Sequence, residues 1–309
     1  MTRHLPQSPQ LAAVQTHFTV PTALGEVSVR VIGDGDGGWG GSGGAAVLLL
    51  HANPGDSRDF DAVLPALARE ATVVTLDWPG FGGSTTTAPA QVTAEGLVTV
   101  AEEVVDALAS RGLTRLSVLG NSVGGYVAAR LARRRPAAVA GVILVDPGGF
   151  TPRNALTRFF CRTVMGRPRT ARLLAAPLAR AYLGRLRTSS ARATYARAKR
   201  LRYERARLET HCALWRSFTE PSFDLGGGAG GQPCVPGTVP TLLIWGRRDP
   251  VVPDPVDGRR ARAALPHATA VRLPTGHEPF NERPREFLGH VLPFLRARTA
   301  TGGADRAAH

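Results

Sequence analysis

Five short apolar runs, separated by segments with a helical pattern, constrain the fold of this chain most strongly. A run that is apolar throughout is typical of a strand buried on both faces of a parallel sheet. Strand and helix alternating at this spacing predict such a sheet, with helices as right-handed crossovers. The apolar runs lie at residues 45–50, 72–76, 116–119, 142–145 and 241–245, with further strands predicted at 26–32 and 269–273 and helices at 60–69, 93–110, 123–135, 259–265 and 285–296.

The alternation breaks between residues 150 and 239, where the chain is arginine-rich and mostly helical in pattern. We expect residues 1–149 and 240–298 to form one α/β core, residues 150–239 to be an insert, and residues 299–309 to be a flexible tail. Two glycine-rich stretches, 33–44 and 226–231, are predicted to be surface loops because so much glycine disfavours strand and helix. The 43% of hydrophobic residues suffices for a substantial core.

The positive charge of the chain is concentrated in the insert. Residues 151–220 contain 17 Lys and Arg against three Glu, which accounts for the whole formal charge of +14. Such a surface could steer an anionic small molecule or, less plausibly because no known binding module is present, nucleic acid. The simpler explanation is a solvated arginine face, since Arg192, Arg197, Arg200 and Arg207 recur at near-helical spacing and predict an exposed stripe.

Neither a membrane span nor a disulfide framework is expected. No run of about 18 apolar residues is present, and the first residues lack the apolar stretch of a secretory signal. Cys161, Cys212 and Cys234 are widely spaced and odd in number, which matches neither a disulfide pattern nor a zinc pattern. We therefore expect a cytoplasmic protein without a metal site. The sequence leaves the oligomeric state open.

The segment Gly120-Asn121-Ser122-Val123-Gly124 lies where a predicted strand meets a predicted helix. A serine at such a junction stands on a sharp turn, and the glycines allow strand and helix to approach closely. The helix N-terminus adds partial positive charge for a developing anion. The sequence context therefore favours Ser122 as a nucleophile over a glycine-rich helix cap.

A serine hydroxyl needs a base, and His277 is the candidate because it follows the last predicted strand. Two aspartates compete to orient this histidine. Asp249 and Asp146 both follow predicted strands, where open α/β sheets place their sites. The chain order serine, acid, histidine favours Asp249 and leaves Asp146 as the alternative.

The segment His51-Ala52-Asn53-Pro54-Gly55 follows the first apolar run. A backbone N–H at this place can meet the N–H of the residue after the nucleophile and form an oxyanion hole. We assign the two donors to Asn53 and Val123. The alternative is an ordinary Asn-Pro-Gly turn.

These motifs, with Asp77-Trp78-Pro79-Gly80-Phe81-Gly82-Gly83-Ser84 between them, resemble those of α/β-hydrolase-fold enzymes with a helical cap. The resemblance covers most of residues 24–298 outside the insert. It implies a mostly parallel sheet flanked by helices, with the cap inserted after the sixth strand. It also implies that residues 77–84 form a structural turn. The chain departs from the family at Ala52, where glycine is usual.

A serine nucleophile indicates acyl transfer, so the expected activity is that of a carboxylesterase-like hydrolase without a cofactor. Aspartate-dependent dehalogenases and epoxide hydrolases are disfavoured. Thioesterase or acyltransferase activity and carbon–carbon hydrolysis of vinylogous diketo acids stay open, and the Gly-Asn-Ser elbow resembles the latter enzymes. Those enzymes commonly have tryptophan where this chain has Glu278. A ligand-binding protein that has lost catalysis is the alternative from another functional class.

Overall fold

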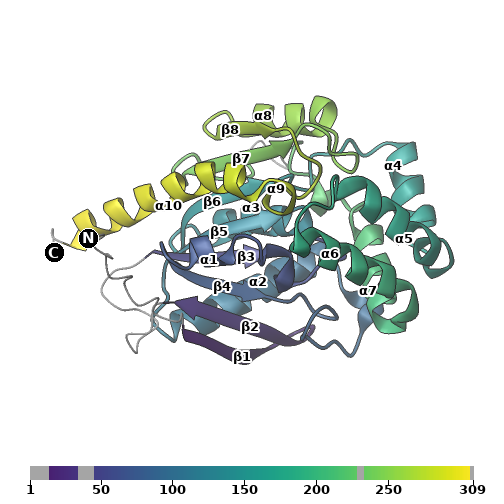
Figure 1. Ribbon diagram of the computed structural model, residues 1–309, viewed down its shortest axis with the longest axis horizontal. Coiled ribbons are helices and arrows are strands. Elements are labelled where there is room, and N and C mark those ends of the chain that lie inside the picture. The colour runs from purple at the N-terminus through teal and green to yellow at the C-terminus, as the bar shows by residue number, and fades with distance from the viewer. Residues whose placement is uncertain (1–13, 34–44, 228–232, 307–309) are drawn as a thin grey trace, which may run out of the picture.

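A single eight-stranded sheet organises the chain (Figure 1). The computed structural model describes residues 14–33, 45–227 and 233–306. The strand order is β1-β2-β4-β3-β5-β6-β7-β8, in which β2 is antiparallel to both of its neighbours, β1 and β4, and all other neighbouring strands are parallel. The strands are β1 (Val14–Thr22), β2 (Gly25–Gly33), β3 (Ala46–Leu50), β4 (Thr72–Leu76), β5 (Leu116–Asn121), β6 (Val139–Val145), β7 (Thr241–Gly246) and β8 (Thr269–Leu273).

Helices cover both faces of the sheet, because successive side chains of its central strands point to opposite faces. In β3, Leu48 and Leu50 pack in one apolar cluster with α2 and α3, whereas Val47 and Leu49 pack in another with α1 and α10. All four side chains are fully buried, as the apolar run predicts. The helices are α1 (Leu64–Leu67), α2 (Ala94–Ala109), α3 (Val123–Arg134), α4 (Ala155–Phe159), α5 (Pro168–Tyr182), α6 (Ser189–Arg200), α7 (Arg205–Ser217), α8 (Arg259–Ala264), α9 (Pro279–Glu282) and α10 (Pro284–Arg306).

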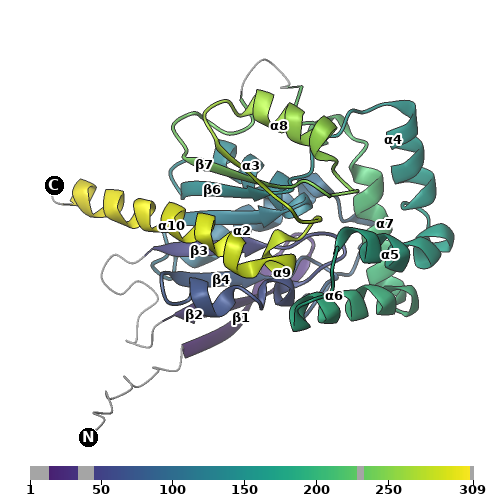
Figure 2. The ribbon, with the colours of Figure 1, turned by 45° about the horizontal axis from the view of Figure 1, so that its top comes forward.

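Helices α4 to α7 follow β6 and precede β7, so they interrupt the parallel sheet after its sixth strand as expected. They gather at one end of the sheet in both ribbon views (Figures 1 and 2). We call the described residues between β6 and β7 the cap segment. It has its own small apolar clusters, one of which includes Met165, Leu208 and Trp215. The cap segment therefore contributes apolar side chains of its own beside the sheet.

Several predicted boundaries differ from the structure. Strand β1 was not predicted, although Thr16, Phe18 and Val20 alternate with more polar residues, and it pairs with β2 along its whole length. The helix expected at 60–69 is reduced to a 3-10 turn, η2 (Ser57–Phe60), and the four-residue α1. Proline at the start of α1 is compatible with a new helix but not with continuing the preceding one.

The C-terminal helix is longer than predicted. Helix α10 continues to Arg306 through most of the predicted flexible tail, and residues 307–309 lie outside the described part. A helix already nucleated by packed turns propagates at low cost, so Gly302 and Gly303 do not end it. The predicted loop at 33–44 lies outside the described residues apart from Gly33, and so does the loop at 226–231 apart from its first two residues.

Each of the three cysteines is unpaired and buried. Burial raises the pKa of the Cys161, Cys212 and Cys234 thiols to about 11, so all three are protonated at neutral pH. Within the described segments, each helix is too short or too polar to cross a lipid bilayer.

Candidate active site

Ser122 stands on a strained turn between β5 and α3. Its φ of 56° and ψ of −117° lie outside the regions that side chains favour. A Cβ at Gly124 would lie 2.2 Å from the carbonyl oxygen of Leu50, so only glycine allows α3 to approach β3 this closely. The sequence thus builds a sharp elbow that presents the serine beyond the end of its strand.

His277 and Asp249 meet at the ends of two strands that neighbour each other. Asp249 follows β7 and His277 follows β8, and the Nδ1 of His277 lies 2.6 Å from the Oδ2 of Asp249. Both side chains are buried. The other carboxylate oxygen of Asp249 accepts hydrogen bonds from the backbone N–H groups of Val251 and Val252 at 2.7 and 3.2 Å. Because the carboxylate accepts the Nδ1 proton, the Nε2 of His277 is free to act as a base.

Ser122 and His277 line the same cavity, which has a volume of about 400 Å³. The cap segment supplies much of its wall, and the remainder comes from loops that follow the strands. Most of the wall is apolar. Its larger apolar side chains include Phe160, Met165, Leu178, Trp215, Phe218 and Phe223.

Asp146, the alternative acid, lies beside this pair without bonding to the histidine. Its Oδ1 accepts a hydrogen bond from the backbone N–H of Gly246 at 2.7 Å, and its Oδ2 has no partner among the described residues. Complete burial, followed by the charge of Asp249, raises the pKa of Asp146 well above its usual value. Burial therefore favours the protonated form of Asp146, whereas Asp249 accepts hydrogen bonds that stabilise a carboxylate. Of the two candidates, Asp249 is the one that the structure brings to His277.

Asp146, Asp249 and His277 are also the group of described residues that could hold a metal ion, since one ligand atom of each lies within 4.8 Å of the others. The hydrogen bond of 2.6 Å already occupies the Nδ1 and Oδ2 atoms that a metal would need. The hydrogen bond between His277 and Asp249 explains why these groups lie so close together without a bound ion. The absence of a metal and of a cofactor stays a prediction.

The loop after β3 places Asn53 at the cavity, opposite the start of α3. Among the described residues, none accepts a hydrogen bond from the backbone N–H of Asn53 or Val123. Asn53 lines the cavity and Val123 directly follows Ser122, which also lines it, so the two unbonded donors fit the predicted oxyanion hole. Ala52, the position where the family resemblance implied glycine, is buried and also lines the cavity.

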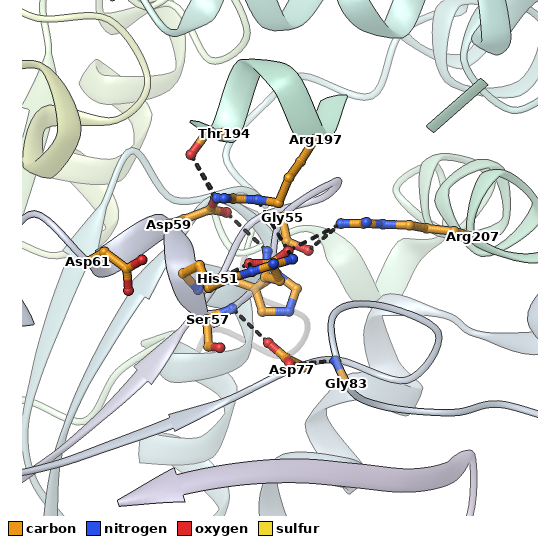
Figure 3. Close-up of polar contacts among 12 residues, drawn as sticks. His51, Gly55, Ser57, Asp59, Asp61, Asp77, Gly83, Thr194, Arg197 and Arg207 are labelled. Carbon is orange, nitrogen blue, oxygen red and sulfur yellow. Dashed lines mark hydrogen bonds and ion pairs between the residues drawn. The ribbon is translucent and has the colours of Figure 1, made fainter. Parts of the chain in front are cut away.

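His51 fixes this loop and is not part of the cavity. Its Nδ1 donates to the carbonyl oxygen of Ala52 at 2.7 Å, and its Nε2 accepts from the backbone N–H of Trp78 at 2.8 Å. Burial lowers the pKa of His51, in agreement with a neutral ring. Asp77 accepts hydrogen bonds from the N–H groups of Ser57 and Gly83, both at 2.7 Å, so it holds the turn that the family resemblance implied (Figure 3).

A cluster of buried charges joins the cap segment to the sheet domain (Figure 3). Arg197 of α6 and Arg207 of α7 pair with Asp56, and Arg197 also pairs with Asp59. We call these four residues the cap–core ion cluster. The two arginine side chains are only 12% and 14% exposed, so the prediction that they belong to an exposed stripe is wrong. The reason is that their acidic partners lie far away in the sequence, before β4.

Two residues that position His277 were missed in the sequence. The backbone N–H of His277 donates to the carbonyl oxygen of Tyr182 at 2.9 Å, and the tyrosine ring packs edge-on against the imidazole. The side chain of Asn121 donates to the carbonyl oxygen of His277 at 3.0 Å. Asn121 directly precedes Ser122 and could have been suspected, whereas no local pattern singles out Tyr182.

Comparison with known proteins agrees with this architecture. A family model described as alpha/beta hydrolase fold matches residues 45–284. A serine hydrolase-like protein from Danio rerio is 32% identical over 145 residues, which cover 47% of this chain and 41% of that protein. The chain spans less than half the length of the first curated relatives that it matches.

Solved structures resemble nearly the whole chain. An enol-lactonase from Burkholderia xenovorans LB400 superposes with a TM-score of 0.70 and 21% identity, over 90% of this chain and 99% of the other. A thermophilic esterase from Thermogutta terrifontis gives a TM-score of 0.68 and 24% identity, over 92% and 99%. At these identities the likeness shows the fold.

Proposed function

Because the chain belongs to the α/β hydrolase fold family, we propose that it is a serine hydrolase that cleaves an ester-type bond of a small molecule through an acyl-enzyme. The observation that carries the proposal is the 2.6 Å contact between His277 and Asp249 beside a cavity that Ser122 also lines. The relative named serine hydrolase-like protein supports the same chemistry.

In the proposed reaction, the Oγ of Ser122 attacks the carbonyl carbon while the Nε2 of His277 takes the hydroxyl proton. The carbonyl oxygen becomes an oxyanion, which accepts hydrogen bonds from the N–H groups of Asn53 and Val123. His277 then gives its proton to the leaving alcohol, and the acyl group stays on Ser122. Water, activated by the same histidine, hydrolyses this ester and restores the serine.

Asp249 orients the imidazole and stabilises its protonated form. The state of Asp146 is compatible with Asp249 as the carboxylate that orients His277. Burial favours the neutral form of the Asp146 carboxyl group, and a neutral carboxyl adds no second negative charge beside the Asp249 carboxylate.

Ester-type substrates are favoured over vinylogous diketo acids by the position of Glu278. This residue is buried, hydrogen bonded to the Nδ2 of Asn281 at 2.6 Å, and absent from the cavity wall. Its pKa is raised, first by burial and then by the charge of Asp59, which places it toward the cap–core ion cluster. The position where the carbon–carbon hydrolases commonly have tryptophan therefore does not shape this cavity.

An anionic substrate stays a prediction. Arg153 lines the cavity, but it already faces Asp224 at 3.6 Å. Arg197 and Arg207, paired with buried aspartates, leave less free charge for a nucleic acid than the sequence suggested. We also retain a cytoplasmic location as a proposal, on the cysteine pattern of the sequence.

The test replaces Ser122 with alanine and measures hydrolysis of small p-nitrophenyl esters together with labelling by a fluorophosphonate probe. We expect the wild-type enzyme and a control variant at an exposed serine, Ser110→Ala, to hydrolyse esters and to be labelled, and Ser122→Ala to do neither. Undiminished turnover in Ser122→Ala would reject the mechanism. A folded wild-type protein that neither reacts nor is labelled would favour the ligand-binding alternative.

A further inference from the structure

Helix α7 contributes two residues to the wall of the active-site cavity, and each has a buried polar ring atom without a partner among the described residues. His211 and Trp215 lie one helical turn apart, both line the cavity, and their ring centroids are 6.2 Å apart. The Nε2 of His211 and the Nε1 of Trp215 are buried, and neither has a hydrogen-bond partner among the described residues. Buried polar atoms are nearly always bonded in folded proteins, so two such atoms on neighbouring rings indicate a missing ligand group.

The contacts of His211 determine what its free nitrogen can do. The side-chain Nδ2 of Asn53 donates to the backbone carbonyl oxygen of His211 at 3.3 Å, so the Asn53 Oδ1 faces the ring. That oxygen lies 2.9 Å from Nδ1, which must therefore donate. Burial lowers the pKa of His211 to about 3, and the charge of Arg207 adds to the effect. In the neutral ring with Nδ1 protonated, Nε2 is an acceptor.

Trp215 supplies the opposite function, because an indole Nε1–H can only donate. The pair thus consists of one acceptor and one donor. A carboxylate offers no donor to His211, and an ammonium offers no acceptor to Trp215. A hydroxyl group does both with a single oxygen atom.

Three other polar side chains of the cavity wall already have partners. Thr151 bonds to Asp257, Thr157 to the carbonyl oxygen of Pro152, and Arg153 faces Asp224. Among the described residues of the wall, the two rings on α7 are the ones whose buried side-chain nitrogen atoms have no hydrogen-bond partner. They also adjoin Asn53, whose N–H is a proposed oxyanion donor, so a group bound there lies near the scissile carbonyl.

We propose that His211 and Trp215 form a hydroxyl-binding subsite, and that the substrate is a hydroxylated ester. This inference rests on the proposed function. The hydroxyl donates to the Nε2 of His211 and accepts from the Nε1 of Trp215. A site built for such a group discriminates against the analogue that lacks it, because the buried partners then stay unbonded.

The test compares esters that differ by one hydroxyl. On the acyl side, p-nitrophenyl hexanoate is matched with its 2-, 3- and 6-hydroxy derivatives. On the alcohol side, propyl hexanoate is matched with 2-hydroxyethyl hexanoate. We expect kcat/KM for at least one hydroxylated ester to exceed that of its partner by about 10- to 100-fold, the range for one satisfied buried group. No preference in either series would indicate that water alone occupies the subsite and would overturn the proposal.

Two substitutions of His211 separate binding from positioning. His211→Asn keeps a donor near Asn53 but removes the acceptor, so the preference for the hydroxylated ester should fall to near unity. His211→Gln keeps an acceptor near the Nε2 position but loses the donor, so both substrates should slow while the preference persists. Trp215→Phe should reduce the preference in the same direction as His211→Asn. A preference unchanged in both His211→Asn and Trp215→Phe would refute the subsite.

A binding measurement distinguishes failure of this inference from failure of the proposed function. Calorimetry on Ser122→Ala compares the methyl ester of the preferred hydroxyhexanoate with methyl hexanoate, and all three hydroxyhexanoates are used if none is hydrolysed. Tighter binding of a hydroxylated ligand that His211→Asn abolishes supports the subsite even if no ester is cleaved. Equal binding of both ligands counts against the subsite even if esters are cleaved.

Discussion

Replacing Arg197 with methionine tests whether the cap–core ion cluster holds the cap segment on the sheet. The guanidinium of Arg197 lies 3.2 Å from the Oδ2 of Asp56, pairs with the Oδ1 of Asp59 and donates to Thr194 at 2.9 Å. Methionine keeps much of the aliphatic volume and removes the charge. Breaking a buried ion pair by removing one partner costs about 3–5 kcal/mol of folding free energy.

The surroundings place the expected loss at the lower end of that range. Asp56 keeps Arg58 at 2.7 Å and Arg207 at 3.5 Å. Asp59 keeps a hydrogen bond from Thr194 at 3.0 Å, and it can take up a proton. Burial raises the pKa of Asp59, and the charge of Asp56 raises it further. The charge of Arg197 opposes this shift. We therefore expect a loss of about 3 kcal/mol, or a fall of about 1 M in the urea midpoint if the slope is about 3 kcal/mol/M.

The assay is urea unfolding at pH 5, 7 and 8, with Arg200→Met as the control because Arg200 is exposed on the same helix. Without the guanidinium the pKa of Asp59 rises further, so the folded state holds its proton more tightly than the unfolded state. Stability of Arg197→Met should therefore fall further as the pH rises. Adding Asp59→Asn should recover part of the loss at pH 8. The reasoning is refuted if Arg197→Met and Arg200→Met differ by less than about 0.5 kcal/mol, the scatter of ordinary surface substitutions.

Three further substitutions test the elbow and the neutral aspartate. Because burial raises the pKa of Asp146, the folded state keeps this proton above about pH 4, where the unfolded chain releases it, so the contribution of Asp146 to stability falls as the pH rises. Asp146→Asn should therefore show a shallower decline in stability than the wild type between pH 5 and pH 9; equal urea-midpoint slopes would contradict this. Gly124→Ala should prevent folding because its Cβ would lie 2.2 Å from a carbonyl oxygen of β3. The control is Gly289→Ala in α10, where the new Cβ would face open space, and this variant should keep or raise the melting temperature. Ser122→Gly should be more stable than Ser122→Ala by about 1 kcal/mol, since glycine tolerates a φ of 56°, and equal melting temperatures would mean that the elbow is not strained.

Local patterns predicted the sheet well because burial on both faces leaves few alternatives. The apolar run before His51 became β3, and the predicted strand at 269–273 has the bounds of β8. The elbow was also predictable, since the glycines around Ser122 lie within four residues of the turn that needs them. Strand β1 was missed because its alternation follows a polar, proline-containing start.

Contacts between distant segments could not be predicted. The pairing of Arg197 with Asp59 joins residues 138 positions apart, and in the sequence Arg197 looks like any solvated helix residue. The sequence favoured Asp249 and left Asp146 as the alternative, because both follow predicted strands; the hydrogen bond between His277 and Asp249 was visible only in the structure. The acceptor character of the His211 Nε2 follows from the hydrogen bond of its Nδ1 to Asn53, which lies 158 positions away.

The hydrogen bond from the His277 backbone to Tyr182 has a consequence for exchanging parts between relatives. Tyr182 is the last residue of α5, so the cap segment supports the proposed base through a main-chain carbonyl at 2.9 Å. A chimaera with a cap segment from another protein would lose activity unless a helix of that cap placed a backbone carbonyl oxygen where it accepts the hydrogen bond from the His277 N–H. Conversely, a ligand that displaces α5 would break the hydrogen bond that positions His277 without contacting Ser122.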